Sequence, residues 1–289
     1  MSVDALLRGG FFLIAGPCVL EDDALNLRVG TALAELQVRM GVPVIFKASF
    51  DKANRSKAGA ARGPGLDEGL RRLERVRSAT GLPLLTDVHE PHQCAAAAQV
   101  VDVLQIPAFL GRQTDLVEAA ARTGRALNIK KGQWMAPEEM AGPVGKAAAA
   151  GAGAVTVTER GTFLGYGDLV VDMRSFARMR EATGAPVVFD GTHSVQRPGR
   201  ADGASGGDPR FIPSLVMAAM AAGADALFLE THPHPHTAPS DGSNMLVLSE
   251  LPALIARVLD IRDAAGLTAG VGERAMGTAG TAGVAGTAR

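Results

Sequence analysis

Short apolar runs and longer helical segments alternate eight times along this 289-residue chain, and this repeat constrains its fold more than any other feature. The runs have the length and composition of buried strands, and they span residues 11–15, 43–47, 83–87, 101–106, 126–130, 154–158, 186–190 and 224–230. Segments with helical spacing of apolar residues follow them, over residues 21–40, 66–80, 91–98, 114–123, 137–150, 169–183, 212–222 and 246–264. Eight strand–helix units predict an α/β protein with one domain, a TIM (β/α)8 barrel.

Glycine and proline mark the borders between several of these units. Gly41-Val-Pro43, Gly81-Leu-Pro83 and Gly184-Ala-Pro186 each place a glycine at a helix end and a proline at a strand start, as both residues prefer. A doubly wound open sheet is the alternative fold. That fold usually has a glycine-rich phosphate-binding turn after its first strand, and Ala15-Gly-Pro-Cys18 is not such a turn. The barrel is therefore the better prediction.

Three stretches lie outside the repeat. Residues 1–10 form a short N-terminal segment before the predicted barrel domain of residues 11–264. Residues 265–289 are rich in Gly, Ala and Thr, which predicts a flexible tail that adds nothing to the core. Residues 197–210, rich in Gly, Asp and Ser, separate the seventh strand from its helix. Loops of that length are often mobile lids or binding loops.

Charge and hydropathy exclude several classes of partner. The net charge of −1 gives no overall field to attract nucleic acid or an anionic membrane, so any anion binding is local. No apolar stretch reaches the roughly 18 residues of a membrane span, and no signal-type segment begins the chain. We therefore expect a cytoplasmic enzyme with no nucleic-acid or membrane partner. Two cysteines, Cys18 and Cys94, are too few for a disulfide framework.

Polar side chains follow nearly every predicted strand at its carboxyl end. In a TIM barrel these ends all face one mouth, where the active site lies. The residues concerned are Cys18, Lys47, Ser49, Lys52, Asp87, Gln105, Lys130, Lys131, Glu159, Arg160, Asp190, His193, Glu230 and His232. A barrel that served only as a scaffold would not need this set, so the sequence predicts an active site at the mouth.

One subset of these residues is cationic. Lys47, Lys52, Lys130 and Arg160 follow the second, fifth and sixth strands, and such a concentration repels itself unless a multiply charged anion lies between the cations. A phosphate or carboxylate substrate fits this requirement. The alternative for residues 47–56 is a solvated basic loop.

A second subset has the chemistry of metal ligands. Cys18, His193, Glu230 and Asp241 offer a thiolate, an imidazole and two carboxylates, a set that suits a divalent metal such as Fe(II), Zn(II) or Mn(II). The alternative for Cys18 is a small core residue. The alternative for either His193 or His232 is a structural histidine held by hydrogen bonds. The run Thr231-His-Pro-His-Pro-His236 has alternatives as a metal site or as exposed loop histidines.

Seven motifs, together with these strand ends, resemble the 3-deoxy-D-manno-octulosonate 8-phosphate synthase family over residues 11–264. They are Ala15-Gly-Pro-Cys18, Lys47-Ala-Ser-Phe-Asp-Lys-Ala-Asn-Arg-Ser56, Thr86-Asp-Val-His89, Gln105-Ile-Pro-Ala-Phe109, Asn128-Ile-Lys-Lys-Gly-Gln133, Asp190-Gly-Thr-His-Ser-Val-Gln196 and Glu230-Thr-His-Pro233. The resemblance implies a TIM-barrel transferase of lipopolysaccharide (KDO) biosynthesis. It condenses phosphoenolpyruvate with arabinose 5-phosphate and water and releases phosphate. Cys18 stands where metal-independent members have Asn, which implies the metal-dependent class.

The resemblance also implies roles for individual residues. The residues that it implies bind phosphoenolpyruvate are Lys47, Ser49, Lys52, Gln105, Lys130 and Arg160, with Asp87 as a further substrate-binding residue. The residues that it implies bind arabinose 5-phosphate are Asn54, Arg55 and Ser56. Arg112 resembles an arginine that reaches a neighbouring subunit's sugar phosphate, which implies a homotetramer. The family's metal ligands match Cys18, His193, Glu230 and Asp241, and the expected catalytic residues are Lys52, His193 and Asp241.

Some positions depart from the family pattern, and two other functions compete. The residues that differ from the usual ones are Lys57, Gly111, Arg200 and Asp202. These differences affect the expected contacts to the sugar phosphate and the behaviour of the loop of residues 197–210, and they leave the expected reaction unchanged. The nearest rival is 3-deoxy-arabino-heptulosonate 7-phosphate synthase, which uses erythrose 4-phosphate. It usually carries Lys-Pro-Arg-Thr where this chain has Lys52-Ala-Asn-Arg55, so Asn54 discriminates. The other rival is a non-catalytic barrel that binds a sugar phosphate, which the retained ligands and cations oppose.

Overall fold

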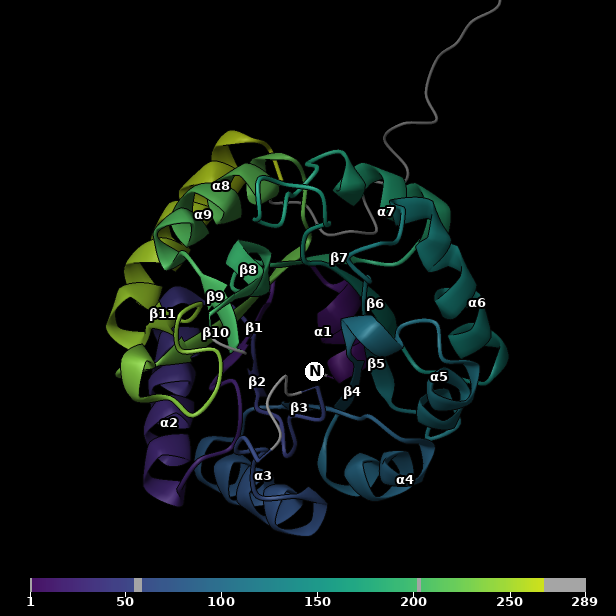
Figure 1. Ribbon diagram of the computed structural model, residues 1–289, viewed down its shortest axis with the longest axis vertical. Helices are drawn as coiled ribbons and strands as arrows, with labels where there is room; N and C mark the ends of the chain where they lie inside the picture. Colours follow the sequence, from purple (N-terminus) through teal and green to yellow (C-terminus); the bar gives the residue numbers. More distant parts are fainter. Residues whose placement is uncertain (1, 55–58, 202–203, 268–289) are drawn as a thin grey trace, which may run out of the picture.

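Eight parallel strands close into a barrel within the part of the chain that the structure, a computed structural model, describes: residues 2–54, 59–201 and 204–267 (Figure 1). Each strand pairs with the next along the chain, and the first pairs with the last. The barrel strands are β1 (Leu13–Gly16), β2 (Val44–Lys47), β3 (Leu84–Asp87), β4 (Val103–Ile106), β5 (Ala126–Lys130), β6 (Val155–Glu159), β7 (Val187–Asp190) and β10 (Ala226–His232). The predicted TIM barrel is confirmed.

Helices surround the barrel in the predicted alternation. They are α2 (Asp23–Met40), α3 (Leu66–Thr80), α4 (Pro91–Val100), α5 (Thr114–Ala121), α6 (Ala141–Ala149), α7 (Ser175–Thr183), α8 (Ile212–Ala221) and α9 (Leu251–Ala264). Short 3-10 turns add η1 (Ala108–Leu110), η2 (Pro137–Met140), η3 (His193–Val195), η4 (Pro209–Phe211), η5 (Pro235–Thr237) and η6 (Leu248–Glu250). Among the described residues, no helix combines the length and the apolar character needed to cross a membrane.

Several helices begin later than the sequence predicts, and the delay is longest in two of them. The segment of residues 169–183 becomes helical only at Ser175, because Val170 pairs with Thr162 in an antiparallel bridge and donates its backbone N–H to the Thr162 carbonyl. The segment of residues 246–264 begins with a short strand, β11 (Leu246–Val247), that extends the sheet beside β10. In both segments, pairing of extended backbone replaces the first helical turn.

The N-terminal segment contains a helix, α1 (Val3–Arg8), that the sequence analysis did not predict. Ser2 caps it by accepting a hydrogen bond from the Ala5 backbone N–H at 3.2 Å. Leu6 and Leu7 pack into the amino-terminal end of the barrel, against inward-facing strand residues such as Ile45 and Phe228. Helix α1 is visible through the barrel in Figure 1. It closes the end of the barrel opposite the strand carboxyl ends.

The hydrophobic core has two parts, one on each face of the barrel wall. Residues on the outer face, such as Leu13, Val44 and Leu127, pack with the surrounding helices. Residues on the inner face, such as Ile14 and Val188, fill the barrel together with α1. Because both faces are buried, the strands read as continuous apolar runs, and polar side chains are left for the mouth.

The predicted loop of residues 197–210 contains a hairpin instead. Strands β8 (Gln196–Ala201) and β9 (Ala204–Gly207) pair antiparallel, with Gln196 opposite Gly207. The turn η4 (Pro209–Phe211) follows and leads into α8. In the view of Figure 1, the hairpin overlaps the part of the barrel wall that contains β10. The departures at Lys57 and Asp202 lie outside the described residues, as does the predicted flexible tail from residue 268 onward.

Candidate active site

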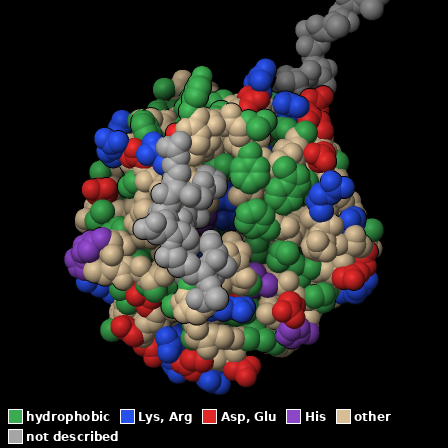
Figure 2. Space-filling view, viewed as in Figure 1, with side chains coloured by type: hydrophobic (Ala, Val, Ile, Leu, Met, Phe, Trp, Pro, Cys, Tyr) green, Lys and Arg blue, Asp and Glu red, His purple; other side chains and the backbone are tan. Residues whose placement is uncertain are grey.

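A cavity of about 680 Å³ opens at the carboxyl ends of the strands. Seven of the predicted substrate or metal residues line it directly, and they are Lys47, Lys52, Asp87, Gln105, Lys130, Arg160 and Glu230. Loop residues add His193, Asn54 and the stretch from Ala238 to Ser243, which includes Asp241. Figure 2 shows basic side chains at the bottom of the central hollow. The barrel therefore brings together residues that are up to about two hundred positions apart in the sequence.

Lys47, at the end of β2, lies in a fully buried ion pair. Its Nζ atom is 2.6 Å from Glu230 Oε1 and 3.7 Å from Asp87 Oδ2, and it donates to the Cys18 carbonyl at 3.0 Å. Burial would raise the pKa of the Glu230 carboxyl, but Lys47 and neighbouring cations outweigh it and hold that pKa well below its usual range. Glu230 is thus a carboxylate next to the bottom of the cavity.

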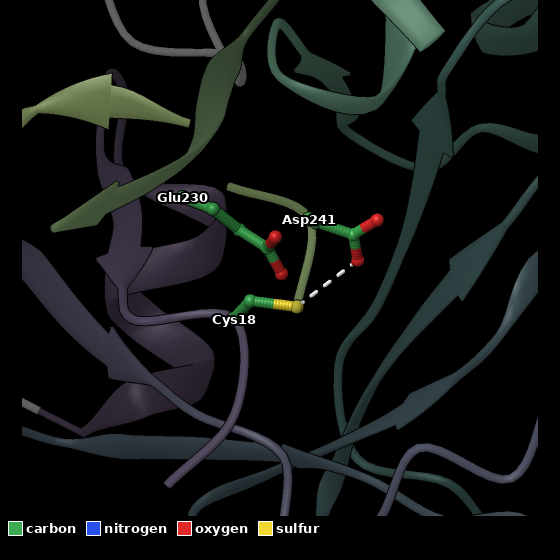
Figure 3. Close-up of side chains that lie close together, drawn as sticks. All are labelled: Cys18, Glu230 and Asp241. Carbon is green, nitrogen blue, oxygen red and sulfur yellow. Dashed lines mark hydrogen bonds between the residues drawn. The ribbon is translucent and has the colours of Figure 1, made fainter. Parts of the chain in front are cut away.

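Three potential metal ligands lie around one point. One ligand atom from each of Cys18, Glu230 and Asp241 lies within 4.8 Å of the other two, and Figure 3 shows the three side chains close together, with a dashed line from Cys18 to Asp241. The Cys18 thiol donates to Asp241 Oδ2 at 3.1 Å and to Ser240 Oγ at 3.2 Å. A sulfur and two carboxylates from separate segments form a mixed donor set that fits Fe, Zn or Mn.

His193 faces this cluster from β7's side of the mouth. Its Nε2 atom lies 3.7 Å from Glu230 Oε2, close enough for both groups to reach one ion. Its Nδ1 atom lies 2.7 Å from Asp190 Oδ2, and a carboxylate on one ring nitrogen is the usual support for a histidine whose other nitrogen holds a metal. Among the described residues, Cys18, Glu230 and Asp241 therefore form one close group of potential metal ligands, and His193 lies beside that group rather than within it.

Burial controls the protonation of Cys18. Desolvation raises the pKa of its thiol well above the usual value, and the negative charge of Glu230 adds to the rise. Asp241 is different: burial and Glu230 would raise the pKa of its carboxyl, but His193 and Lys52 outweigh them and lower it. Without a cation between them, the site therefore holds a neutral thiol beside two carboxylates.

Lys130, at the end of β5, pairs with Asp190 at 2.6 Å. Its Nζ atom also lies 3.6 Å from the centre of the Phe228 ring, a cation–π contact. Burial lowers the pKa of Lys130, and Asp190 opposes that effect. Asp190 itself is fully buried, and its pKa is well below the usual range because His193, Lys130 and Arg160 outweigh the effect of burial.

Arg160 connects to Asp241 through one glutamine. Its Nη2 atom donates to Gln196 Oε1 at 2.5 Å, and Gln196 Nε2 donates to Asp241 Oδ1 at 3.4 Å. The Nε atom of Arg160 is buried without a hydrogen-bond partner among the described residues. A buried guanidinium with a free N–H at a cavity is suited to an anionic ligand.

Lys52 lines the β2 side of the cavity and contacts the buried Ser49. Lys52 Nζ donates to Ser49 Oγ at 3.0 Å, and the Ser49 hydroxyl donates to Asp87 Oδ2. Burial would lower the pKa of Lys52, but the negative charges of Glu230 and Asp87 outweigh burial and raise that pKa. Asp87 keeps a pKa far below normal because Lys47 and Lys52 outweigh its burial. Lys52 is therefore an ammonium.

Other predicted residues lie elsewhere. Arg112 is exposed at the surface, where its Nη1 atom is 3.6 Å from Glu139, and it is not part of the cavity wall. Arg55 and Ser56 lie outside the described residues. Lys131 is fully buried beside Glu159 at 3.5 Å. The buried ion pair of Lys131 and Glu159 thus connects the segment after β5 with the end of β6.

The histidine run after β10 separates into two kinds of residue. His232 is buried, accepts the His234 backbone N–H at 2.9 Å on Nδ1, and has Nε2 3.1 Å from Glu21. It is a hydrogen-bonded structural histidine. His234 and His236 lie on the following loop with ring centres 6.2 Å apart, and within the described residues neither belongs to a group of metal ligands.

Several residues at the site were given no role from the sequence. Asp190 and Gln196 support the charged groups described above, and His89, Phe109 and Phe163 line the cavity. Asp190 ends β7 and was among the strand-end residues predicted at the mouth, although its contacts were not predicted. His89 lies just after β3, so position alone could have indicated it. Gln196 begins strand β8 and Phe163 lies in the loop after β6, and no spacing rule predicts their contacts.

Known proteins are similar to this chain over most of its length. The model of the family described as the DAHP synthetase I family matches residues 8–263. The chain is 53% identical over 248 residues to a 2-dehydro-3-deoxyphosphooctonate aldolase of Rhodopseudomonas palustris (strain BisB5), which covers 86% of each chain. It is 52% identical over 261 residues to the protein of that name from Trichlorobacter lovleyi, covering 89% of this chain and 96% of the relative. A protein of that name from Acidithiobacillus ferrooxidans is 53% identical over 252 residues, 87% of this chain and 89% of its own. The chain therefore belongs to the DAHP synthetase I family.

Proposed function

We propose that this protein condenses phosphoenolpyruvate with D-arabinose 5-phosphate and water to give 3-deoxy-D-manno-octulosonate 8-phosphate and phosphate. The name 2-dehydro-3-deoxyphosphooctonate aldolase, which the relatives carry, denotes this same enzyme. The observation that carries the proposal is the single cavity where Lys47, Lys52, Lys130 and Arg160 lie beside the Cys18, Glu230 and Asp241 cluster. One reaction, a step in KDO formation for lipopolysaccharide, accounts for both the group of cations and the cluster of potential metal ligands.

The cations are the proposed site for phosphoenolpyruvate. Its phosphate and carboxylate together carry a charge that matches Lys47, Lys130 and Arg160, with Ser49 and Gln105 as further hydrogen-bonding groups. In the structure, carboxylates of Glu230 and Asp190 lie against two of these lysines, which keeps the cations in position before the anion binds. Preorganised charge of this kind stabilises the charge that develops on the reacting groups.

Lys52 is the proposed proton donor to the arabinose 5-phosphate aldehyde oxygen. Its raised pKa keeps it an ammonium, and it lines the cavity next to Asn54. When the C3 carbon of phosphoenolpyruvate bonds to the aldehyde carbon, the aldehyde oxygen becomes an alkoxide and takes a proton. Water adds at C2 and loses its proton to a carboxylate, for which Asp241 is the candidate. Phosphate then leaves C2.

A divalent transition metal, Fe, Zn or Mn, is the proposed cofactor, held by Cys18, His193, Glu230 and Asp241. A bound metal supplies Lewis acidity, which polarises the aldehyde or orients the water. The donor set and the Asp190 contact to His193 Nδ1 support this proposal. The thiol of Cys18 has to lose its proton to serve as a ligand.

The rival acceptor is erythrose 4-phosphate, used by the heptulosonate synthases. Asn54 stands at the cavity where those enzymes usually have Arg, and the relatives described above carry the octonate name. A non-catalytic barrel is disfavoured because the described residues retain the whole set of predicted metal ligands.

We also propose that the enzyme is a cytoplasmic homotetramer. Hydrophobic side chains gather beside the central hollow (Figure 2). Exposed residues in this part of the chain include Phe109 and Trp134, whose rings stack at 6.0 Å, and Phe163, Leu164 and Tyr166. Such a patch at the rim of a site supports burial against another subunit, and Arg112 follows Phe109 closely enough to share that interface. Sedimentation velocity tests the assembly, and Arg112→Ala should raise the KM for arabinose 5-phosphate more than that for phosphoenolpyruvate.

The experiment that tests the reaction is product analysis by mass spectrometry. Purified protein is supplied with phosphoenolpyruvate and either arabinose 5-phosphate or erythrose 4-phosphate. The proposal predicts the phosphorylated eight-carbon 3-deoxy acid from the first pair and no product from the second. A seven-carbon product alone would assign the protein to the heptulosonate synthases.

A further inference from the structure

A continuous chain of buried hydrogen bonds crosses the inside of the barrel from β6 to the loop after β2. Thr156 and Thr158 contact Asn128 Oδ1 at 2.9 and 2.7 Å. Asn128 Nδ2 donates to Gln105 Oε1 at 2.8 Å, and Gln105 Nε2 donates to Asp87 Oδ1 at 2.6 Å. The members of the chain are Thr156, Thr158, Asn128, Gln105, Asp87, Ser49 and Lys52. Side chains from four adjacent strands, β3 to β6, are thereby connected with the loop after β2.

The direction of every hydrogen bond in this chain is fixed. Asp87 is an ionised carboxylate, so it only accepts, and the Gln105 group next to it has to be the NH2. Gln105 therefore presents its carbonyl oxygen to Asn128, which has to answer with its own NH2. The two threonine hydroxyls then donate to Asn128 Oδ1. Neither amide can flip without placing two acceptors against each other.

This direction matters for the cavity because Gln105 lines it and Asn128 does not. The NH2 of Gln105 has two hydrogens, and Asp87 takes one. The other is available to an anionic ligand, whereas a flipped Gln105 would present its carbonyl oxygen toward Asp87 and repel it. Asn128 is fully buried below this level, so its influence on a ligand has to pass through Gln105.

We infer that Asn128 is a positioning residue for phosphoenolpyruvate, because it holds the Gln105 amide in the one orientation that presents N–H groups to an anion. This inference rests on the proposed function, since it takes phosphoenolpyruvate as the anion. The competing explanation is that Asn128 only satisfies buried polar groups and stabilises the barrel. The two explanations differ in whether the affinity for phosphoenolpyruvate depends on residue 128 donating a hydrogen bond to Gln105.

The variant that separates them is Asn128→Asp, which keeps the shape and removes the NH2. An ionised carboxylate there faces Gln105 Oε1, so either that contact or the Gln105 contact to Asp87 becomes repulsive. The matched control is Thr156→Val with Thr158→Val, which removes both hydroxyls from Asn128 Oδ1 and leaves the orientation of Gln105 fixed by Asp87. Both variants disturb the same buried network, but only the first reverses its polarity.

We expect Asn128→Asp to raise the KM for phosphoenolpyruvate about tenfold or more, the usual effect of losing a hydrogen bond to a charged group. The KM for arabinose 5-phosphate should change less than about threefold. The Thr156→Val/Thr158→Val control should keep the KM for phosphoenolpyruvate within about threefold, even if it unfolds at a lower temperature. Quenching of the fluorescence of Trp134, the one tryptophan in the chain, gives the affinity for phosphoenolpyruvate independently of turnover.

The pH dependence gives a second readout. The described side chains that form hydrogen bonds with the Asn128 side chain are Gln105 from β4 and Thr156 and Thr158 from β6, and none of them titrates. In the Asn128→Asp variant, the protonated form of the new carboxyl can donate to Gln105 and restores the original direction. The KM for phosphoenolpyruvate of Asn128→Asp, divided by that of the unmodified protein, should therefore fall as the pH is lowered from about 9 to about 6.

Three outcomes decide the inference. A selective, pH-dependent rise in the KM for phosphoenolpyruvate, absent from the double-valine control, supports it. Equal effects of both variants, or an unchanged KM for phosphoenolpyruvate in Asn128→Asp, would overturn it and leave Asn128 structural. If the unmodified protein gave no product from arabinose 5-phosphate, the proposed function would fail first, and direct phosphoenolpyruvate binding by Trp134 fluorescence would still test Asn128.

Discussion

Asp190 and His193 are joined by a 2.7 Å contact between Oδ2 and Nδ1, and the same carboxylate oxygen accepts the Lys130 ammonium at 2.6 Å. One buried oxygen thus supports both a proposed metal ligand and a proposed phosphoenolpyruvate cation. The backbone N–H of His193 donates to the other oxygen of Asp190 at 2.9 Å. Asp190 therefore fixes the position of the loop that follows β7 as well as the orientation of the imidazole ring.

Replacing Asp190 with Asn should weaken metal binding and phosphoenolpyruvate binding together. The neutral amide forms weaker hydrogen bonds to the His193 ring and to Lys130 than the carboxylate does, and loss of such a supporting carboxylate typically lowers metal affinity about 10–100-fold. Lys130→Met is the control, because it removes the cation and leaves the contact to His193 Nδ1. Competition with a chelator measures the metal affinity of both variants. Unchanged metal affinity in Asp190→Asn would contradict the role given to His193.

Cys18→Ser should abolish bound metal with little loss of stability. A serine hydroxyl can still donate to Ser240 and Asp241, as the thiol does, but it does not ionise near neutral pH. Cys94→Ser is the matched control, because Cys94 lies in α4, away from the cavity. Metal content by atomic emission and unfolding by circular dichroism measure the two effects. Retention of metal by Cys18→Ser would remove Cys18 from the ligand set.

Metal affinity should increase with pH by up to about tenfold per unit, because binding displaces the Cys18 proton. Burial raises the pKa of that thiol, so the thiol is protonated throughout the neutral range and protons compete with the metal. The lowered pKa values of Glu230 and Asp241 mean that these carboxylates are already ionised there and add no slope. Chelator competition between about pH 6 and 8 measures the slope. An affinity independent of pH would contradict thiolate ligation.

Gly16→Ala should destabilise the barrel and disturb Lys47. A Cβ atom at Gly16 would lie 2.1 Å from the Lys47 carbonyl oxygen, and overpacking of this kind costs about 1–3 kcal/mol, occasionally more. Gly142→Ala in α6 is the control, since nothing lies within 4 Å of its added Cβ, and it should be neutral or stabilise by up to about 1 kcal/mol. Urea unfolding compares the two. Equal stability of both variants would contradict the close approach of β1 and β2.

The barrel was predictable because each strand is buried on both faces and each helix has one apolar face. Those periodicities place elements such as α3 and β5 at their observed bounds. Helix α1 was missed because a helix of six residues is too short for a periodic pattern. The hairpin of β8 and β9 was missed because its residues are mostly small or polar and show no alternating apolar pattern. Only the backbone pairing of the two strands reveals it.

The site was predictable to the extent that strand ends determine position. Cys18, Lys47 and Glu230 converge because the barrel closes, which strand order alone implies. The supporting contacts of Asp190 and Gln196 depend on side-chain orientation, which no spacing rule gives. Arg112 was assigned by resemblance, and its role depends on a second subunit, so a single chain does not test it.

The most direct test of the whole account is phosphate release from phosphoenolpyruvate, measured with each sugar phosphate before chelation, after chelation and after a divalent metal is added back. The account predicts release with arabinose 5-phosphate and not with erythrose 4-phosphate, loss of that release on chelation, and its recovery with Fe, Zn or Mn. Undiminished turnover of the chelated enzyme would contradict the metal site. Release with erythrose 4-phosphate alone would contradict the proposed reaction.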